Sequence, residues 1–133
     1  MVRRADGAYV YQLAVTVDDG EVGVTEVVRG ADLLSSAPRQ MYLQSLFGFQ
    51  HPKYGHVPML LAPDGRRLSK RDQDLDLGAL RTRFTAPELL GLLSCSAGLT
   101  DRNAPISLQE LISAFSWEKL QKDAIYLDNG LFE

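Results

Sequence analysis

The chain has 133 residues, of which 45% are hydrophobic, 23% charged and 8% aromatic, and its formal net charge is −3. This length and composition are typical of one compact soluble domain. With 14 Lys and Arg against 17 Asp and Glu, binding of phosphates over the whole surface is excluded, so any phosphate contact has to be local.

The number of cysteines and the length of the apolar runs indicate in which cellular compartment the protein is expected. The single Cys95 excludes a disulfide framework and favours a reducing compartment, so we expect a cytoplasmic protein. Runs such as residues 57–62 are far shorter than the ~20 residues that a membrane span needs. No signal-peptide run follows Met1, and we expect no membrane partner.

The first third of the chain is rich in β-branched residues. We predict strands over residues 9–17 and 22–28, the first ending in the turn-forming Asp18-Asp19-Gly20 and the second at Arg29-Gly30. A helix then follows from a serine cap and Pro38 to Gly48, because apolar residues recur there at helical spacing.

The middle of the chain has a loop-like segment over residues 49–56 and a short predicted strand over residues 57–62. Pro63-Asp64-Gly65 is a turn signal, so the basic residues 66–71 lie on a loop just beyond that strand. Two helices are predicted after Thr85 and Ser107, because each of these caps is followed three residues later by a glutamate.

Few residues have the chemistry of a site on their own. Lys70 and Ser69 in the basic loop suit a polyphosphate, although a solvated basic turn is the usual meaning of such a cluster. Arg29 at a strand end suits a carboxylate, and an ion pair with Asp32 or Glu26 is an equal alternative. Cys95 is expected to be a buried small residue.

His56 and Tyr11 carry less information by themselves. His56 has no cysteine or second histidine at ligand spacing, so no metal site is predicted within these residues. Tyr11 lies inside the first apolar segment, where most tyrosines belong to the core.

Together, several segments resemble the later part of the catalytic domain of the class I glutamyl-tRNA synthetase family. They occur in the family's order and spacing: Arg4-Ala5-Asp6-Gly7, Tyr11-Gln12-Leu13-Ala14-Val15, Val27-Val28-Arg29-Gly30-Ala31-Asp32-Leu33, Pro38-Arg39-Gln40, Tyr54-Gly55-His56-Val57-Pro58 and Arg67-Leu68-Ser69-Lys70-Arg71. Within the family, the second and third of these segments are more similar to the glutamyl-Q tRNA(Asp) synthetase group, which lacks an anticodon-binding domain.

The resemblance implies an α/β fold, namely the second half of a Rossmann-like class I synthetase catalytic domain followed by a small helical region. Residues 1–75 would form the half of the nucleotide-binding fold that includes the Leu-Ser-Lys loop. Residues 76–133 would form a helical region packed on it. The preceding half, with the family's His-Ile-Gly-His-type signature and the zinc site of the glutamyl-Q group, is expected to lie outside this chain.

The resemblance also implies roles for individual residues. Tyr11 and Arg29 would bind glutamate, Arg29 through a carboxylate, and Lys70 would act in catalysis by stabilising the departing pyrophosphate. Leu68, Ser69, Lys70 and His56 would contact ATP, which enters with Mg²⁺. The first lysine of the family's Lys-Met-Ser-Lys-Ser-type loop is replaced here by Arg67, and its last serine by Arg71.

The implied activity is that of a ligase that activates glutamate with ATP and transfers it to the queuosine of tRNA(Asp). Such a chain is expected to be inactive alone and to self-associate through an exposed sheet edge. Two alternatives remain open at this point: a fragment of a glutamyl-tRNA synthetase that charges tRNA(Glu), and a non-catalytic module that binds a nucleotide or a partner.

Overall fold

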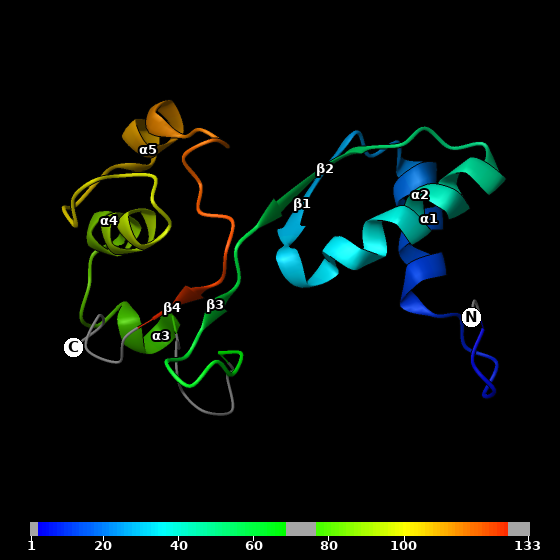
Figure 1. Cartoon of the computed structure of the whole chain (residues 1–133), viewed down its shortest axis with the longest axis horizontal. Coiled ribbons are helices and arrows are strands. Elements are labelled where there is room, and N and C mark those ends of the chain that lie inside the picture. The colour runs from blue at the N-terminus through cyan, green and yellow to red at the C-terminus, as the bar shows by residue number, and fades with distance from the viewer. Residues whose placement is uncertain (1–2, 69–76, 128–133) are drawn as a thin grey trace. The chain divides into compact units, whose positions relative to one another are not determined.

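The computed structural model describes residues 3–68 and 77–127, and Figure 1 shows the course of the chain. By its internal contacts the chain divides into two units, Met1–Val57 and Pro58–Glu133. The boundary expected at residue 75 falls within residues 69–76, outside the described residues, and remains a prediction.

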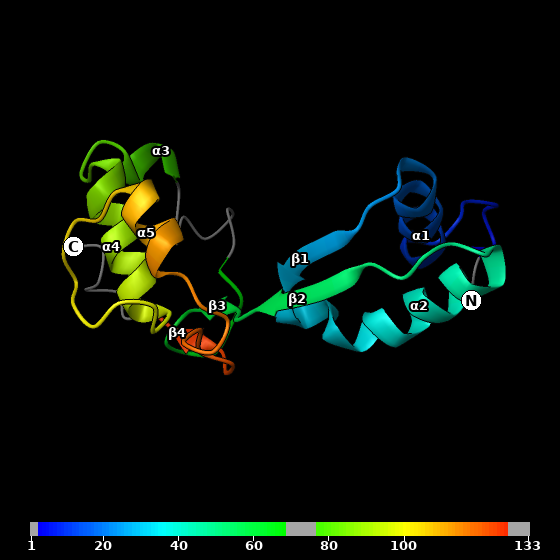
Figure 2. The same ribbon diagram turned by 90° about the horizontal axis from the view of Figure 1, so that it is seen from above.

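The first unit is built around two parallel strands, β1 (Glu26–Gly30) and β2 (Lys53–Val57). The 3-10 helix η1 (Ala31–Ser36) and the helix α2 (Ala37–Phe47) connect them, as a parallel pair requires. The helix α1 (Tyr11–Val22) packs against α2. Figures 1 and 2 show β1 and β2 side by side in both views.

The strand predicted over residues 9–17 is wrong, because α1 occupies this segment. Gly20, predicted to be in a turn, is instead a helical residue, and a Cβ atom there would lie 2.3 Å from Cδ2 of Phe49. Packing against Phe49 and α2 therefore overrides the β propensity of the valines. The helix ends at Gly23, whose φ of 77° suits a left-handed cap.

The strand pair also begins later than predicted. β1 shares only residues 26–28 with the segment predicted over 22–28, because Val22 still belongs to α1. β2 occupies part of the segment predicted as a loop, and its ladder with β1 is a contact that local sequence does not show. The strand predicted over 57–62 is divided at Pro58, which has no N–H to donate, and resumes as β3 (Leu60–Leu61).

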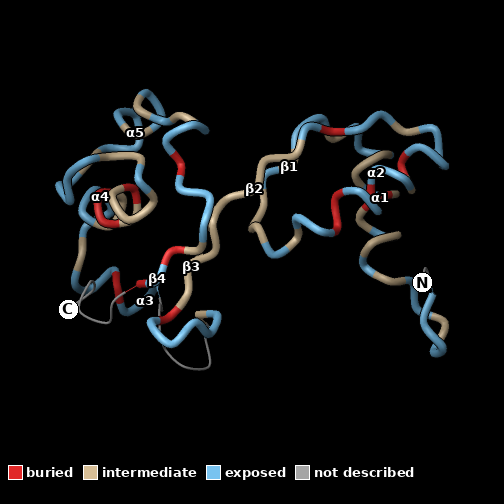
Figure 3. Tube along the Cα trace, viewed as in Figure 1, coloured by how far each residue is buried: buried red, intermediate tan, exposed pale blue. Residues whose placement is uncertain are grey.

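The predicted helix up to Gly48 is confirmed, with Pro38 in the first turn of α2 and Gly48 as the left-handed cap. Its buried face is polar, since Gln40 and Gln44 are each 2% exposed, whereas Leu46 is 63% exposed. With Thr16 of α1, these are the largest fully buried side chains among the described residues. Figure 3 colours the buried residues of this unit red.

The second unit has a small apolar core. β3 pairs in parallel with β4 (Ile125–Tyr126), and the described helices are α3 (Leu77–Leu80), α4 (Ala86–Ser96) and α5 (Leu108–Ala114). The core contains the buried side chains of Leu80, Leu92, Ile125 and Leu127, against which the half-buried Leu68 packs.

Both helix starts predicted in this unit are confirmed. Thr85 begins α4 and Ser107 begins α5, and each forms a capping box with the glutamate three residues on, Glu88 or Glu110. These hydrogen bonds lower the pKa of both glutamates. No helix in the described part of the chain is long and apolar enough to cross a membrane.

Candidate functional site

The centre of the candidate site is a contact between Arg29 and His56. The parallel register places Arg29 of β1 directly beside His56 of β2, near the carboxyl ends of both strands. Arg29 Nε donates a hydrogen bond to His56 Nε2 at 3.2 Å. Because side chains alternate along a strand, Tyr54 lies on the same face two residues earlier, with its ring centroid 4.8 Å from the guanidinium carbon.

The protonation state of His56 follows from this contact. Burial lowers the pKa of His56, and the positive charge of Arg29 lowers it further. Arginine can only donate, so Nε2 must be the acceptor and the ring proton resides on Nδ1. The pair is therefore a guanidinium held by a neutral imidazole.

Each terminal nitrogen of Arg29 donates one hydrogen bond, to α2 and η1 respectively. Nη1 donates to Oε1 of Gln40 at 2.6 Å, and Nη2 donates to the carbonyl oxygen of Leu33 at 3.3 Å. Glu26, one alternative partner predicted for Arg29, lies within 3.7 Å of Lys53 in an exposed ion pair. Arg29 is thus fixed by neutral groups at the strand end, where ligands bind in open α/β sheets.

Two further glutamines extend this arrangement. Gln40 Nε2 donates to Oε1 of Gln12 at 2.8 Å, and Gln12 Nε2 donates to Oγ of Ser36 at 2.9 Å. One turn further along α2, Gln44 Nε2 donates to the hydroxyl oxygen of Tyr54 at 3.0 Å. The interface of α1, α2 and the strands is therefore a polar network that ends at Arg29.

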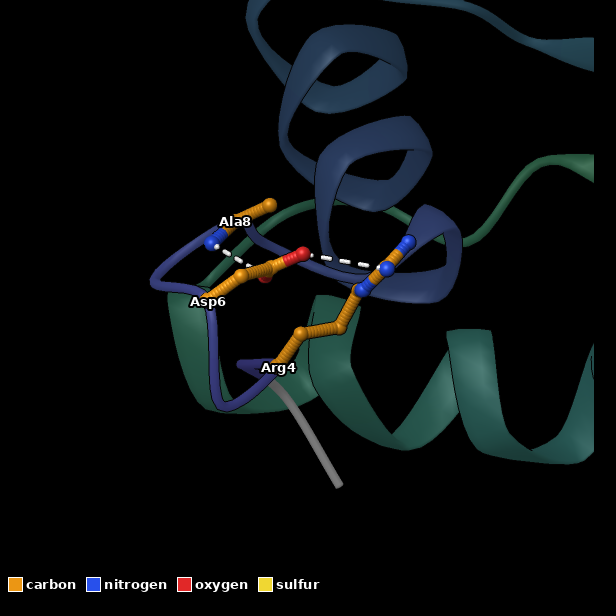
Figure 4. A network of polar contacts seen from close by, with 3 residues as sticks. All are labelled: Arg4, Asp6 and Ala8. Atoms are coloured by element: carbon orange, nitrogen blue, oxygen red, sulfur yellow. Dashed lines mark hydrogen bonds and ion pairs between the residues drawn. The ribbon is translucent and has the colours of Figure 1, made fainter.

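Tyr11 lies at the first turn of α1, next to Gln12, and the residue is 55% exposed. It thus belongs to the same unit as Arg29 and neighbours a residue of the Arg29 network. The segment before it folds back on itself: Arg4 forms an ion pair with Asp6 at 3.0 Å, and Asp6 Oδ1 accepts a hydrogen bond from Ala8 N–H (Figure 4). This turn precedes the extended Val10 that caps α1.

The predicted phosphate loop is described only at its start. The turn at Pro63-Asp64-Gly65 is confirmed, with Gly65 at a φ of 83° and its N–H bonded to the carbonyl oxygen of Ala62. Leu68 packs on the core of the second unit. Ser69 and Lys70, two of the four residues predicted to contact ATP, lie outside the described residues.

Other residues considered from the sequence take no part in this arrangement. Cys95 in α4 is half-buried, and Asp18 and Asp19 lie within α1. Among residues 3–68 and 77–127, no three His, Cys, Asp or Glu side chains gather to hold a metal ion. Two surface cavities of ~550 and ~470 Å³ are lined by other residues than Tyr11, Arg29 and His56.

The sequence missed Gln12, Gln40, Gln44 and Tyr54 as partners of the site. A signal was present, because Gln12 and Thr16 in one segment, and Gln40 and Gln44 in another, are four residues apart. That spacing places each pair on one helix face. Recognising it required knowing that residues 11–22 form a helix rather than a strand.

Comparisons with known proteins agree with the expected family. The model of the class I tRNA synthetase catalytic domain (E and Q) matches residues 1–130. A glutamyl-Q tRNA(Asp) synthetase of Symbiobacterium thermophilum is 44% identical over 126 residues, which are 94% of this chain and 39% of that protein. A protein of the same name from Geobacter sulfurreducens is 60% identical over 81 residues, 61% of this chain and 26% of its own length.

Solved structures show the same fold. A glutamate tRNA ligase of Elizabethkingia meningosepticum superposes with a TM-score of 0.73 at 24% identity, over 98% of this chain and 30% of that one. The α/β fold of a class I catalytic domain is therefore confirmed. The chain spans less than half of each of these relatives, and it belongs to the class I tRNA synthetases (E and Q) as part of their catalytic domain.

Proposed function

We propose that this chain contributes the glutamate-binding and pyrophosphate-side half of the active site of a glutamyl-Q tRNA(Asp) synthetase. In this proposal, the longer protein activates L-glutamate with ATP and transfers it to the queuosine of tRNA(Asp). Relatives of that name, 44% and 60% identical, support this group. The structural observation that carries the proposal is Arg29, fixed by neutral partners at the carboxyl end of β1.

The chemistry assigned to Arg29 follows from its donors. A guanidinium has five N–H groups, and three of them have partners among the described residues. One further N–H on each terminal nitrogen is left for a ligand, which suits the two oxygens of a carboxylate. Arg29 would therefore hold a carboxylate of glutamate, with Tyr11 in the first turn of α1 as the second glutamate contact.

The reaction joins two substrates without a covalent enzyme intermediate. The α-carboxylate of glutamate attacks the α-phosphorus of ATP, and the bond to the bridging oxygen breaks, releasing pyrophosphate with its Mg²⁺. Lys70 would stabilise the negative charge that develops on the pyrophosphate, and Ser69 and the backbone at Leu68 would bind ATP. His56, which the resemblance places in contact with ATP, also accepts a hydrogen bond from Arg29 and would in addition help to hold that guanidinium.

Two alternative functions can be distinguished from this proposal by experiment. The solved structure from Elizabethkingia meningosepticum is named a glutamate tRNA ligase, but at 24% identity this likeness shows only the fold. Transfer to tRNA(Glu) remains the alternative. A binding module without catalysis would use the basic residues 66–71 alone. A cytoplasmic location, a zinc site in the preceding half and self-association of this chain also stay predictions.

Binding of a non-hydrolysable glutamyl-adenylate analogue, measured by calorimetry, tests the residue assignments. We expect Arg29→Ala and Lys70→Ala each to weaken binding by at least ~10-fold, because each removes a charged contact to the ligand. Lys53→Ala is the matched control, since Lys53 is an exposed cation at the opposite end of the β1–β2 pair. Binding that neither Arg29→Ala nor Lys70→Ala changes would defeat the assignments.

A further inference from the structure

A directed chain of hydrogen bonds reaches Arg29 from three other elements of the first unit. It runs from Arg29 Nη1 to Gln40 Oε1 (2.6 Å), from Gln40 Nε2 to Gln12 Oε1 (2.8 Å) and from Gln12 Nε2 to Ser36 Oγ (2.9 Å). The chemistry of the groups fixes the direction of these hydrogen bonds. Because a guanidinium can only donate, it requires an oxygen from Gln40, which in turn leaves the NH₂ of Gln40 for Gln12.

These hydrogen bonds lie in the interior of the unit rather than on its surface. Gln40 is 2% exposed, and Ser36 at the end of the chain is also buried. Buried amides are costly unless both the oxygen and the nitrogen are hydrogen-bonded, and both ends of the Gln40 amide are. Removing the partner of either end of the Gln40 amide would therefore cost free energy.

The charge of the groups that hold Arg29 is as informative as their geometry. Gln40, the Leu33 carbonyl, the neutral His56 and the Tyr54 ring are all uncharged, so the contacts that hold Arg29 leave its positive charge for a ligand. A glutamate at position 40 would supply the same oxygen acceptor in almost the same shape. It would also neutralise Arg29 from within the protein.

We propose that Gln40, supported by Gln12, is a positioning residue that fixes the Arg29 guanidinium and, by being an amide, reserves its positive charge for the carboxylate of the substrate. This rests on the proposed function, in which that substrate is glutamate. Gln40 acts only through Arg29 and is not itself a catalytic residue. The consequence is a site whose preference for an acidic ligand depends on a neutral side chain that the ligand does not touch.

Two substitutions separate the two parts of the proposal. Gln40→Met keeps the volume and removes the acceptor, so it releases Arg29. Gln40→Glu keeps the acceptor and adds the charge. We expect this second variant to fold normally, because the Gln12 amide can rotate by half a turn. Its nitrogen then donates to the new carboxylate, and the Gln12 oxygen accepts from the Ser36 hydroxyl.

The experiment uses the 133-residue chain with ¹⁵N-labelled arginine, followed by NMR during titration with L-glutamate and, for comparison, the uncharged L-glutamine. In the wild type we expect slow rotation of the Arg29 Nη groups and shifts of the Arg29 signals with glutamate only. Gln40→Met should give fast rotation. Gln40→Glu should keep slow rotation and weaken glutamate binding by at least ~10-fold. Gln50→Glu, the same change on an exposed loop residue, should match the wild type.

Several results would overturn the proposal: slow Arg29 rotation in Gln40→Met, wild-type glutamate affinity in Gln40→Glu, or a wild-type chain whose Arg29 signals do not respond to glutamate. Thermal unfolding of each variant checks that it is folded. Failure of this proposal is distinguishable from failure of the proposed function. A chain that binds the adenylate analogue through Arg29 but tolerates Gln40→Glu contradicts only the role of Gln40.

Discussion

His56 and Arg29 form a contact whose strength depends on pH. Burial and the Arg29 charge lower the pKa of His56 below its usual 6.5, so the imidazole is neutral when its Nε2 accepts from Arg29. Protonation removes that acceptor and places two positive charges side by side. The pair is therefore intact above pH 6.5 and is lost as the pH falls through the lowered pKa.

The same shift predicts how stability depends on pH. Between the lowered pKa and about 6.5, the unfolded chain binds a proton at position 56 that the folded chain does not. The contribution of His56 to the free energy of unfolding is therefore constant above this window and decreases as the pH falls through it. NMR titration of the His56 ring measures the pKa, and Arg29→Met should raise it by removing the neighbouring charge. A wild-type His56 that titrates at or above 6.5 contradicts the contact.

Residues of the site differ in how far the sequence could predict them. Arg29 was predicted at a strand end because the β-branched run and Gly30 mark that end locally. Its partners were not, because Gln40 and Gln12 come from two helices that local sequence does not bring together. A buried glutamine has no signature of its own, and in this unit Gln40 and Gln44 are buried while Leu46 and Val28 are exposed.

At the scale of elements, a helix or strand was predicted correctly where residues close in sequence determine it, and wrongly where contacts between distant segments do. The starts of α4 and α5 were predicted because each capping box is complete within four residues. α1 was predicted as a strand because its valines favour β structure, and only the contacts with α2 and Phe49 decide for a helix. β2 was missed for the same reason, since it depends on pairing with β1.

Two helical glycines give a direct test of close packing. At Gly91 in α4, a Cβ atom would lie 2.0 Å from the backbone oxygen of Ala104, whereas at Gly20 in α1 the obstacle is the side chain of Phe49. Alanine gains up to ~1 kcal/mol of helix propensity at either position. Overpacking costs typically ~1–3 kcal/mol, and more where backbone has to move.

Gly91→Ala should therefore lower the midpoint of thermal unfolding, followed by circular dichroism, and it should do so more than Gly20→Ala. The Phe49 ring can move aside in Gly20→Ala, so part of the propensity gain is retained there. A Gly91→Ala variant as stable as the wild type would show that α4 and the segment at Ala104 are not in this contact.

At the scale of the whole molecule, the chain holds part of a catalytic domain. It carries Arg29 in its first unit and the start of the basic loop in its second, and it spans 39% of the Symbiobacterium thermophilum relative. Within the described residues, β1 and β2 form a sheet of only two strands, and several large apolar side chains of that unit are exposed. Both observations fit a chain whose site is completed by further residues of a longer protein.

Glutamate-dependent exchange of pyrophosphate into ATP tests this account most directly. It is measured for the 133-residue chain and for a hybrid in which the chain replaces the matching 126 residues of the Symbiobacterium thermophilum relative, with that relative as the assay control. We predict no exchange by the chain alone, exchange by the hybrid, and a loss of at least ~100-fold in kcat/KM for glutamate in the hybrid with Arg29→Ala, as expected for the loss of a charge-assisted contact to the substrate. Exchange by the chain alone, or a folded hybrid that gives none, would contradict it.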